Sequence, residues 1–194
     1  ISTLELSRQI GVKWDTAWRI RHKLAQAMLE RDAGKKLEGR IEMDDAYLGG
    51  ENPGGKPGRG SENKHPFIAV VETDRQQIRR IHLRPVRSFS IAEIKAYAKA
   101  SLSPDSIVIS DGLGCFKGID EAGLLHLTYV TGGGRNSVKH ASFKWVNTVL
   151  GNLKTAISGT CHAIRDQHIP RYLAEFEYRF NRRYDLPKMI ERLA

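Results

Sequence analysis

Residues 40–48, with the sequence RIEMDDAYL, carry the pattern on which the fold assignment depends. Apolar Ile41 and Met43 alternate with Glu42 and Asp44, which is the two-residue period of a β-strand. A carboxylate beside buried apolar residues costs several kcal/mol unless a cation or a hydrogen-bond donor lies near it. The stretch therefore predicts a strand that brings Asp44 to a site, although for this residue alone a surface position is the simpler interpretation.

Strand and helix patterns follow this segment in a regular order. A meander of three strands leads into alternating helices and strands, and the last third of the chain is helical. The order β-β-β-α-β-α-β-α-α predicts an α/β fold with the mixed sheet of RNase H-like proteins. The expected strands cover 40–48, 66–73, 78–86, 106–110 and about 127–130, and the expected long helices cover 91–102, 142–158 and 169–184.

A second aspartate, Asp111, directly follows the buried strand with Ile-Val-Ile at its centre, and Gly112 allows close backbone approach. Carboxylates at the ends of parallel strands are favoured site positions, although an Asp-Gly pair alone would indicate only a turn. Divalent cations need several converging oxygen ligands, which separate strands can supply. Asp45 points to the opposite sheet face from Asp44, so it is a second-choice ligand or a structural partner.

The helix expected over residues 142–158 presents Asn147 and Lys154 on one face. These two residues are seven positions apart and therefore lie within about 20° of each other. Both fall at one border of the apolar stripe, where a side chain reaches solvent and the sheet together. The stripe comprises Phe143, Val146, Leu150, Leu153 and Ile157.

The N-terminal residues predict two helices around Gly11, the second running through Asp32. A short helix, a glycine turn and a basic second helix resemble a helix-turn-helix module, whose second helix enters a major groove. The alternative is an ordinary helical hairpin with solvated charges. We assign residues 1–38 to this DNA-binding segment and residues 39–194 to the catalytic domain. The expected inward side chains are Ala17, Ile20, Leu24 and Met28, and the expected outward basic side chains are Lys13, Arg19, Arg21, His22 and Lys23.

The loop from Gly49 to His65 is too long for an ordinary hairpin. Its spacing of glycines around Lys56 is partly that of a phosphate-binding loop, but Pro57 stands where Ser or Thr should hold the metal. Lys56, Arg59 and Lys64 are candidates for DNA-backbone contacts, and a solvated loop is the equal alternative.

The amino-acid composition indicates which classes of binding partner the protein could have. Among 194 residues, 31 Lys and Arg against 22 Asp and Glu give a net charge of +9, which favours nucleic acid, although a basic protein without such a partner fits as well. Two cysteines without a Cys-x-x-Cys pair exclude a disulfide scaffold and an internal zinc ribbon, and fit a reducing compartment. No apolar run is long enough to span a membrane. Because the chain starts at Ile1, we expect it to be a fragment.

Several long motifs resemble bacterial insertion-sequence transposases of the DDE type, in the ISXO-like group. IEMDDAYLGG at 41–50 is similar to the first-aspartate motif, ISDG at 109–112 to the second, and WVNTVLGNLK at 145–154 to the third, in the branch with Asn as third catalytic residue. YLAEF at 172–176 and RFNRR at 179–183 resemble the closing helix. The resemblance covers nearly the whole chain. Relatives often carry an upstream zinc-binding segment, which these residues do not supply.

The resemblance implies metal-dependent cleavage and strand transfer of DNA. Asp44, Asp111 and Asn147 would be ligands of two Mg²⁺ or Mn²⁺ ions, and Lys154 would complete the catalytic set by contacting phosphate. The implied partners are double-stranded DNA of element ends and target, and further copies of the chain in a synaptic homo-oligomer. The implied location is the bacterial cytoplasm, at the nucleoid. Because Asn replaces a carboxylate, a catalytically weakened DNA-binding protein stays open, as does a structure-directed nuclease without strand transfer.

Overall fold

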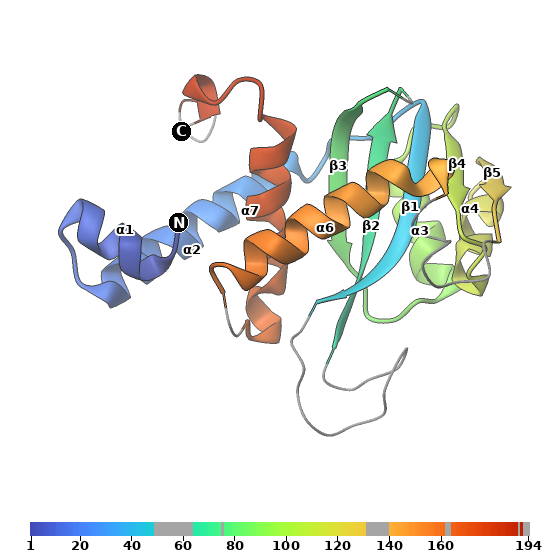
Figure 1. Ribbon diagram of the computed structural model, residues 1–194. Coiled ribbons are helices and arrows are strands. Elements are labelled where there is room, and N and C mark those ends of the chain that lie inside the picture. Colours follow the sequence, from blue (N-terminus) through green and yellow to red (C-terminus); the bar gives the residue numbers. More distant parts are fainter. Residues whose placement is uncertain (49–63, 75, 131–139, 162–163, 190, 192–194) are drawn as a thin grey trace. The chain divides into compact units, whose positions relative to one another are not determined.

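The computed structural model describes residues 1–48, 64–74, 76–130, 140–161, 164–189 and 191 (Figure 1). The chain forms two compact units. One contains Ile1–Ala33 together with Leu153–Ala194, and the other contains Gly34–Asn152. We call them the helical unit and the sheet unit.

The described residues of the sheet unit form a five-stranded mixed sheet in the order β3-β2-β1-β4-β5 (Figure 1). The strands are antiparallel from β1 to β3, whereas β4 pairs in parallel with both β1 and β5. This is the RNase H-like arrangement, and it confirms the fold class predicted from the order of the elements. The strands are β1 (Arg40–Leu48), β2 (His65–Thr73), β3 (Ile78–Pro85), β4 (Ile107–Ser110) and β5 (Leu125–Thr128).

One face of the sheet is covered by α3 (Ile91–Ser101), the turn η1 (Gly114–Phe116) and the short α4 (Lys117–Glu121). Ser90 caps α3 by accepting a hydrogen bond from the Glu93 N–H at 3.3 Å. A Cβ on Gly118 would stand 2.4 Å from the Ile91 carbonyl oxygen, so α3 and α4 pack closely only because this residue is glycine. The core on this face includes Ile41 and Met43 of β1, with Ile68, Val70, Ile94, Ala98, Val108, Phe116 and Ile119 around them.

The opposite face carries Glu42 and Asp44, since successive strand residues alternate between faces. The turn η2 (Ala141–Phe143) and the first part of α6 (Lys144–Ser158) lie next to β1 on this side (Figure 1). The division between the two units falls within α6, after Asn152. The predicted helix start at residue 142 lies in η2, which directly precedes α6. The predicted apolar stripe is confirmed for Phe143, Val146, Leu150 and Leu153, which are buried.

The helical unit contains α1 (Thr3–Ile10), α2 (Trp14–Asp32) and α7 (Ile169–Asn181), with the short turns η3 (Asp166–His168) and η4 (Pro187–Met189). Gly11, at φ 67°, ends α1 in the left-handed conformation, which confirms the predicted turn. α2 packs against α7. Arg182 donates two hydrogen bonds to the buried Asp32 carboxylate at 2.7 and 2.8 Å, which fixes the end of α2.

The predicted inward face of α2 is wrong in part. Leu24, expected inward, is 45% exposed, and His22, expected outward, is buried together with Ala25 and Asp32. The reason is that α7, far along the chain, supplies polar partners for α2. The buried face of α2 therefore does not follow its most apolar side chains.

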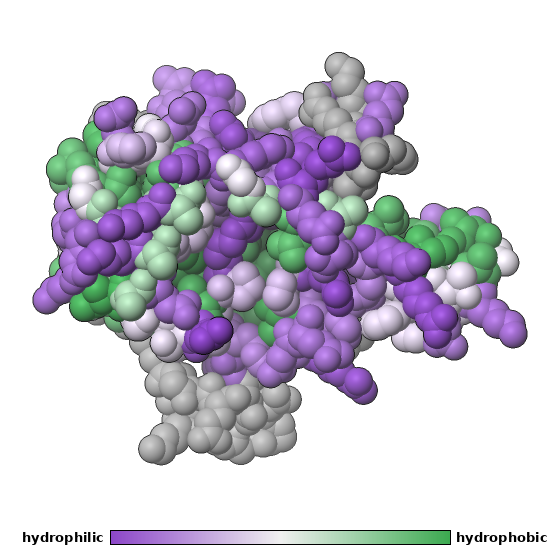
Figure 2. Space-filling model, turned by 180° about the vertical axis from the view of Figure 1, so that it is seen from behind, coloured by the Kyte–Doolittle hydropathy of each residue, from purple (hydrophilic) through white to green (hydrophobic). Residues whose placement is uncertain are grey.

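Hydrophilic residues dominate the face shown in Figure 2, as expected for a chain with 27% charged residues. Among the described residues, no helix has both the length and the apolar character needed to cross a membrane.

Candidate active site

The pairing of β1 with β4 brings two aspartates to the same level. Arg40 lies opposite Ile107 and Glu42 opposite Ile109 in this parallel pair. Asp44 follows Glu42 by two residues and Asp111 follows Ile109 by two residues, so both aspartates lie equally far beyond the last residues of this pairing. The sequence-based expectation that separate strands bring these carboxylates together agrees with this geometry.

Three carboxylates meet at this point. Asp44, Asp45 and Asp111 each offer one oxygen atom, all three within 4.8 Å of one another, and all three residues are partly exposed. The Asp44 carboxylate accepts a hydrogen bond from the Asp45 N–H at 2.9 Å, and the Asp111 carboxylate accepts one from the Leu113 N–H at 3.0 Å. Carboxylate oxygens are the ligands that Mg²⁺ and Mn²⁺ prefer, so the cluster fits a divalent cation.

Asp45 reaches the cluster although it alternates to the other side of β1. Among the described residues, the pairing of β1 with β4 covers Arg40 to Glu42 and ends before Asp45. A carboxylate there can turn around the open edge of β1. The sequence ranked Asp45 as the second-choice ligand, and the end of the β1–β4 ladder is the signal that the sequence did not reveal.

The backbone after Asp111 is held in a conformation that requires glycine. Gly112 has φ +85°, and a Cβ there would stand 2.6 Å from the Thr128 Cγ2 atom and 3.2 Å from the Val130 Cγ2 atom. The chain can therefore turn sharply against β5 directly after the aspartate. This confirms the close backbone approach predicted from the Asp-Gly pair.

A chain of polar side chains supports the end of β4. The Ser110 Oγ and His126 Nε2 atoms are 2.7 Å apart, and the His126 Nδ1 and Asp120 Oδ2 atoms are 2.9 Å apart. This combination has the residue types of a hydrolytic triad, but Ser110 is fully buried at 0% exposure and has no access to a substrate. These hydrogen-bonded side chains therefore connect β4, β5 and α4 next to Asp111.

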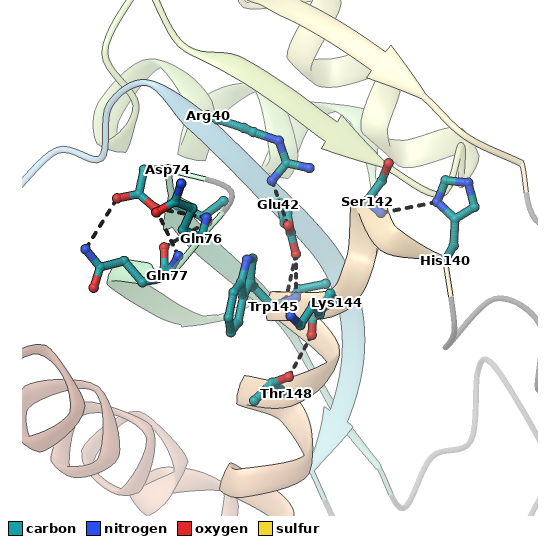
Figure 3. Close-up of polar contacts among 12 residues, drawn as sticks. Arg40, Glu42, Asp74, Gln76, Gln77, His140, Ser142, Lys144, Trp145 and Thr148 are labelled. Carbon is teal, nitrogen blue, oxygen red and sulfur yellow. Dashed lines mark hydrogen bonds and ion pairs between the residues drawn. The ribbon is translucent and has the colours of Figure 1, made fainter.

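The start of α6 is bonded to β1 through a buried carboxylate (Figure 3). The Glu42 Oε2 atom accepts hydrogen bonds from the N–H groups of Trp145 and Val146, both at 2.9 Å. Its Oε1 atom accepts a hydrogen bond from the Arg40 guanidinium at 2.7 Å. The sequence analysis assigned no role to Glu42. The signal was present, because a glutamate on the same strand face as Asp44 needs a partner if it is buried.

Asn147 is half-buried and directly follows Val146 in α6, while Lys154 is exposed one heptad later. The predicted position at the border of the buried stripe is thereby confirmed for Asn147, whereas Lys154, predicted at the same border, is exposed. Lys154 belongs to the helical unit.

The other basic candidates fall into three groups. Lys13, Arg19 and Lys23 are exposed in the helical unit. Arg21 instead forms an ion pair with Glu175 at 3.0 Å, its side chain is 11% exposed, and a phosphate contact would have to compete with this pair. Lys64 is partly exposed just before β2, and Lys56 and Arg59 lie outside the described residues.

The chain was compared with protein families, curated proteins and solved structures. The sequence model of a family described as ISXO2-like transposase domain matches residues 36–181. No curated protein matches the chain. Among solved structures, the magnesium complex of the HTLV-2 integrase catalytic core domain is similar over 77% of this chain and 88% of that chain, with 11% identity and a TM-score of 0.46. The Mos1 mariner paired-end complex with Mn is similar over 100% of this chain and 74% of that chain, with 13% identity and a TM-score of 0.29.

Proposed function

The chain belongs to the ISXO2-like transposase domain family, and we propose that it cuts DNA at the ends of an insertion sequence and joins the freed ends to target DNA. The observation that carries the proposal is the cluster of three carboxylate oxygens within 4.8 Å of one another. Two of its residues lie in the middle of β1 and the third directly follows β4 of an RNase H-like sheet, and the family match covers all three.

Asp44 and Asp111 would hold two Mg²⁺ or Mn²⁺ ions together with the amide oxygen of Asn147. When bound, the ions lower the pKa of the attacking hydroxyl and stabilise the leaving oxygen of an in-line displacement. In the cleavage step a water oxygen bonds to phosphorus, the bond from phosphorus to the 3′ oxygen breaks, and the 3′ oxygen takes up a proton. In the joining step the freed 3′-hydroxyl takes the place of water.

Asp45 has a distinct part in this proposal. Asn147 is neutral, so Asp44 and Asp111 alone would set two negative charges against the four positive charges of two ions. Asp45, whose oxygen lies within 4.8 Å of both other carboxylates, supplies a third negative charge. A DNA phosphate would bring the total to balance, so both ions would bind best with DNA present.

The chain's cations would hold the DNA. Lys154 would contact a phosphate near the scissile bond as a point charge. The exposed Lys13, Arg19 and Lys23 belong to the DNA-binding segment of residues 1–38 in the helical unit, and they would contact the DNA backbone. Two element ends cut in one complex would need at least two copies of the chain.

A plasmid-nicking assay tests the proposal. With an element-end plasmid and Mg²⁺ or Mn²⁺, Asp44→Asn and Asp111→Asn proteins should lose cleavage, whereas Asp105→Asn, an equal charge change at an exposed turn before β4, should cut like the parent. Equal cutting by all four proteins would show that the acidic cluster is not the active site.

A precleaved 3′-hydroxyl end supplied with a target plasmid separates the remaining alternatives. Joined products are expected of a transposase. Cleavage without joining would identify a structure-directed nuclease, and DNA binding without either would identify a catalytically weakened protein, the alternative that Asn147 favours.

A further inference from the structure

Glu42 occupies a position at which an acidic side chain is normally unfavourable. It is fully buried, at 0% exposure, in the middle strand of the sheet. Burial of a carboxylate is tolerated only where hydrogen bonds and opposite charge replace water. Glu42 obtains both, from two backbone N–H groups of α6 and from Arg40 (Figure 3).

These bonds are made at the start of a helix. The first N–H groups of a helix have no partner within it, and the helix dipole favours a negative charge at that end. In the turn η2, directly before α6, the His140 Nδ1 atom accepts a hydrogen bond from the Ser142 N–H at 3.3 Å. Within α6, Glu42 accepts hydrogen bonds from the N–H groups of the second and third residues, Trp145 and Val146, although it lies on a strand more than one hundred residues earlier.

The bonded groups are immediate neighbours of the proposed catalytic residues. Glu42 and Asp44 are two positions apart on β1 and share a face, about 7 Å apart along the strand. Trp145 and Val146 directly precede Asn147 in α6. One carboxylate thus joins the strand that carries the first ligand to the helix that carries the third, next to both.

We propose that Glu42 is a positioning residue, which sets the place of Asn147 relative to Asp44 by holding the start of α6 against β1. Arg40 neutralises the buried charge and keeps the carboxylate turned toward the helix. The inference rests on the proposed function only in taking Asn147 and Asp44 to bind the same ions. The anchor itself is a property of the fold.

Three substitutions of Glu42 distinguish the effect of its side-chain length from the effect of its negative charge. Glu42→Ala removes the acceptor. Glu42→Asp keeps the charge but shortens the side chain by one methylene. Glu42→Gln keeps a single oxygen, and one oxygen suffices because Oε2 accepts both helix bonds. The matched control is Glu72→Ala, which removes a buried carboxylate of β2 that accepts a hydrogen bond from the Glu38 N–H at 3.2 Å.

The first measurement is Mn²⁺ binding to folded protein, without DNA, by electron paramagnetic resonance. Glu42→Ala and Glu42→Asp should raise the dissociation constant about tenfold or more, whereas Glu42→Gln and Glu72→Ala should stay within about threefold of the parent. The second measurement is amide exchange, in which the Trp145 and Val146 N–H groups should lose protection in the Ala and Asp proteins only.

Parent-like Mn²⁺ binding by folded Glu42→Ala would overturn the inference, as would an equal loss in Glu72→Ala. If Glu42→Ala does not fold, the Mn²⁺ affinities of the Glu42→Gln and Glu42→Asp proteins decide. Tighter Mn²⁺ binding by Glu42→Gln supports a positioning role that depends on side-chain length, and any other order refutes it. Failure of the proposed function is distinct, because Asp44→Asn and Asp111→Asn proteins would then bind Mn²⁺ like the parent.

Discussion

Asp45→Asn tests whether the third carboxylate compensates for the neutral Asn147. The substitution keeps the size of the side chain and removes one negative charge from a cluster whose oxygens lie within 4.8 Å of one another. If 4.8 Å, the upper limit of the oxygen–oxygen separations, is taken as a conservative distance between the carboxylate and an ion, two unit charges interact by about 3.5 kcal/mol at an effective dielectric constant of about 20, and by about 0.9 kcal/mol in bulk water. Because the three residues are partly exposed, the lower half of this range applies to each charge of the cation.

A divalent ion doubles the interaction, and water that replaces the carboxylate recovers part of it. We therefore expect a loss of about 1.4–2.8 kcal/mol in Mn²⁺ binding, which is a dissociation constant about 10- to 100-fold higher. Isothermal titration calorimetry at fixed ionic strength measures it, with Asp105→Asn as the control for removal of an exposed carboxylate.

A second substitution makes this prediction more specific. Asn147→Glu should tighten Mn²⁺ binding in the parent, and it should restore much of the affinity lost in Asp45→Asn, because the total charge is then unchanged. The reasoning is refuted if Asp45→Asn binds Mn²⁺ within twofold of the Asp105→Asn control. It is also refuted if Asn147→Glu weakens binding in both backgrounds while the protein stays folded.

Three further predictions concern the fold around the site and the helical unit. Arg182→Met should lower the free energy of unfolding by about 3–5 kcal/mol in urea melts, because it removes both charged hydrogen bonds to the buried Asp32; a loss under about 1 kcal/mol would contradict this. Burial is the largest cause, and nearby positive charges the second, of a lowered His22 pKa, which falls from 6.5 to about 4. Below about pH 6.5 the unfolded chain therefore binds a proton that the folded chain does not. Stability should therefore fall, by on the order of 1–3 kcal/mol, as the pH drops from about 6.5 to about 4, and His22→Gln should flatten the curve; an unchanged curve would argue against it. Gly112→Ala should destabilise the protein by about 1–3 kcal/mol in thermal melts, since its Cβ would meet Thr128 at 2.6 Å at a positive φ; a parent-like melting temperature would count against that contact.

The sequence predicted the sheet well because alternation and buried runs are local signals. The bounds expected for β1 agree with the structure, and β4 begins one residue later than expected. The helix expected to end at residue 184 ends at Asn181, and β5 begins two residues before the expected 127. Such ends depend on caps and neighbours rather than on periodicity.

What the sequence could not supply are contacts between distant residues. The face that α2 buries is set by α7 and by Arg182 directly after it, which bonds to Asp32 across 150 positions. Leu24 is the more apolar residue, yet it stays exposed because the polar partners of α2 decide which side faces inward. Periodicity predicts which residues share a face, but a buried ion pair can determine which face is inward.

The same limit explains why two of the three acidic positions on β1 were ranked below Asp44. On an isolated strand, Glu42 and Asp44 are equivalent residues of one face, and Asp45 belongs to the other. Their difference arises from where neighbouring elements start and stop: α6 begins over Glu42, and the β4 ladder ends there too. Glu42 is therefore buried and bonded to a helix, while Asp44 and Asp45 lie beyond the last residue of β1 that pairs with β4. One strand thus supplies an anchor and two candidate ligands within four positions, and the ends of its neighbours assign the roles.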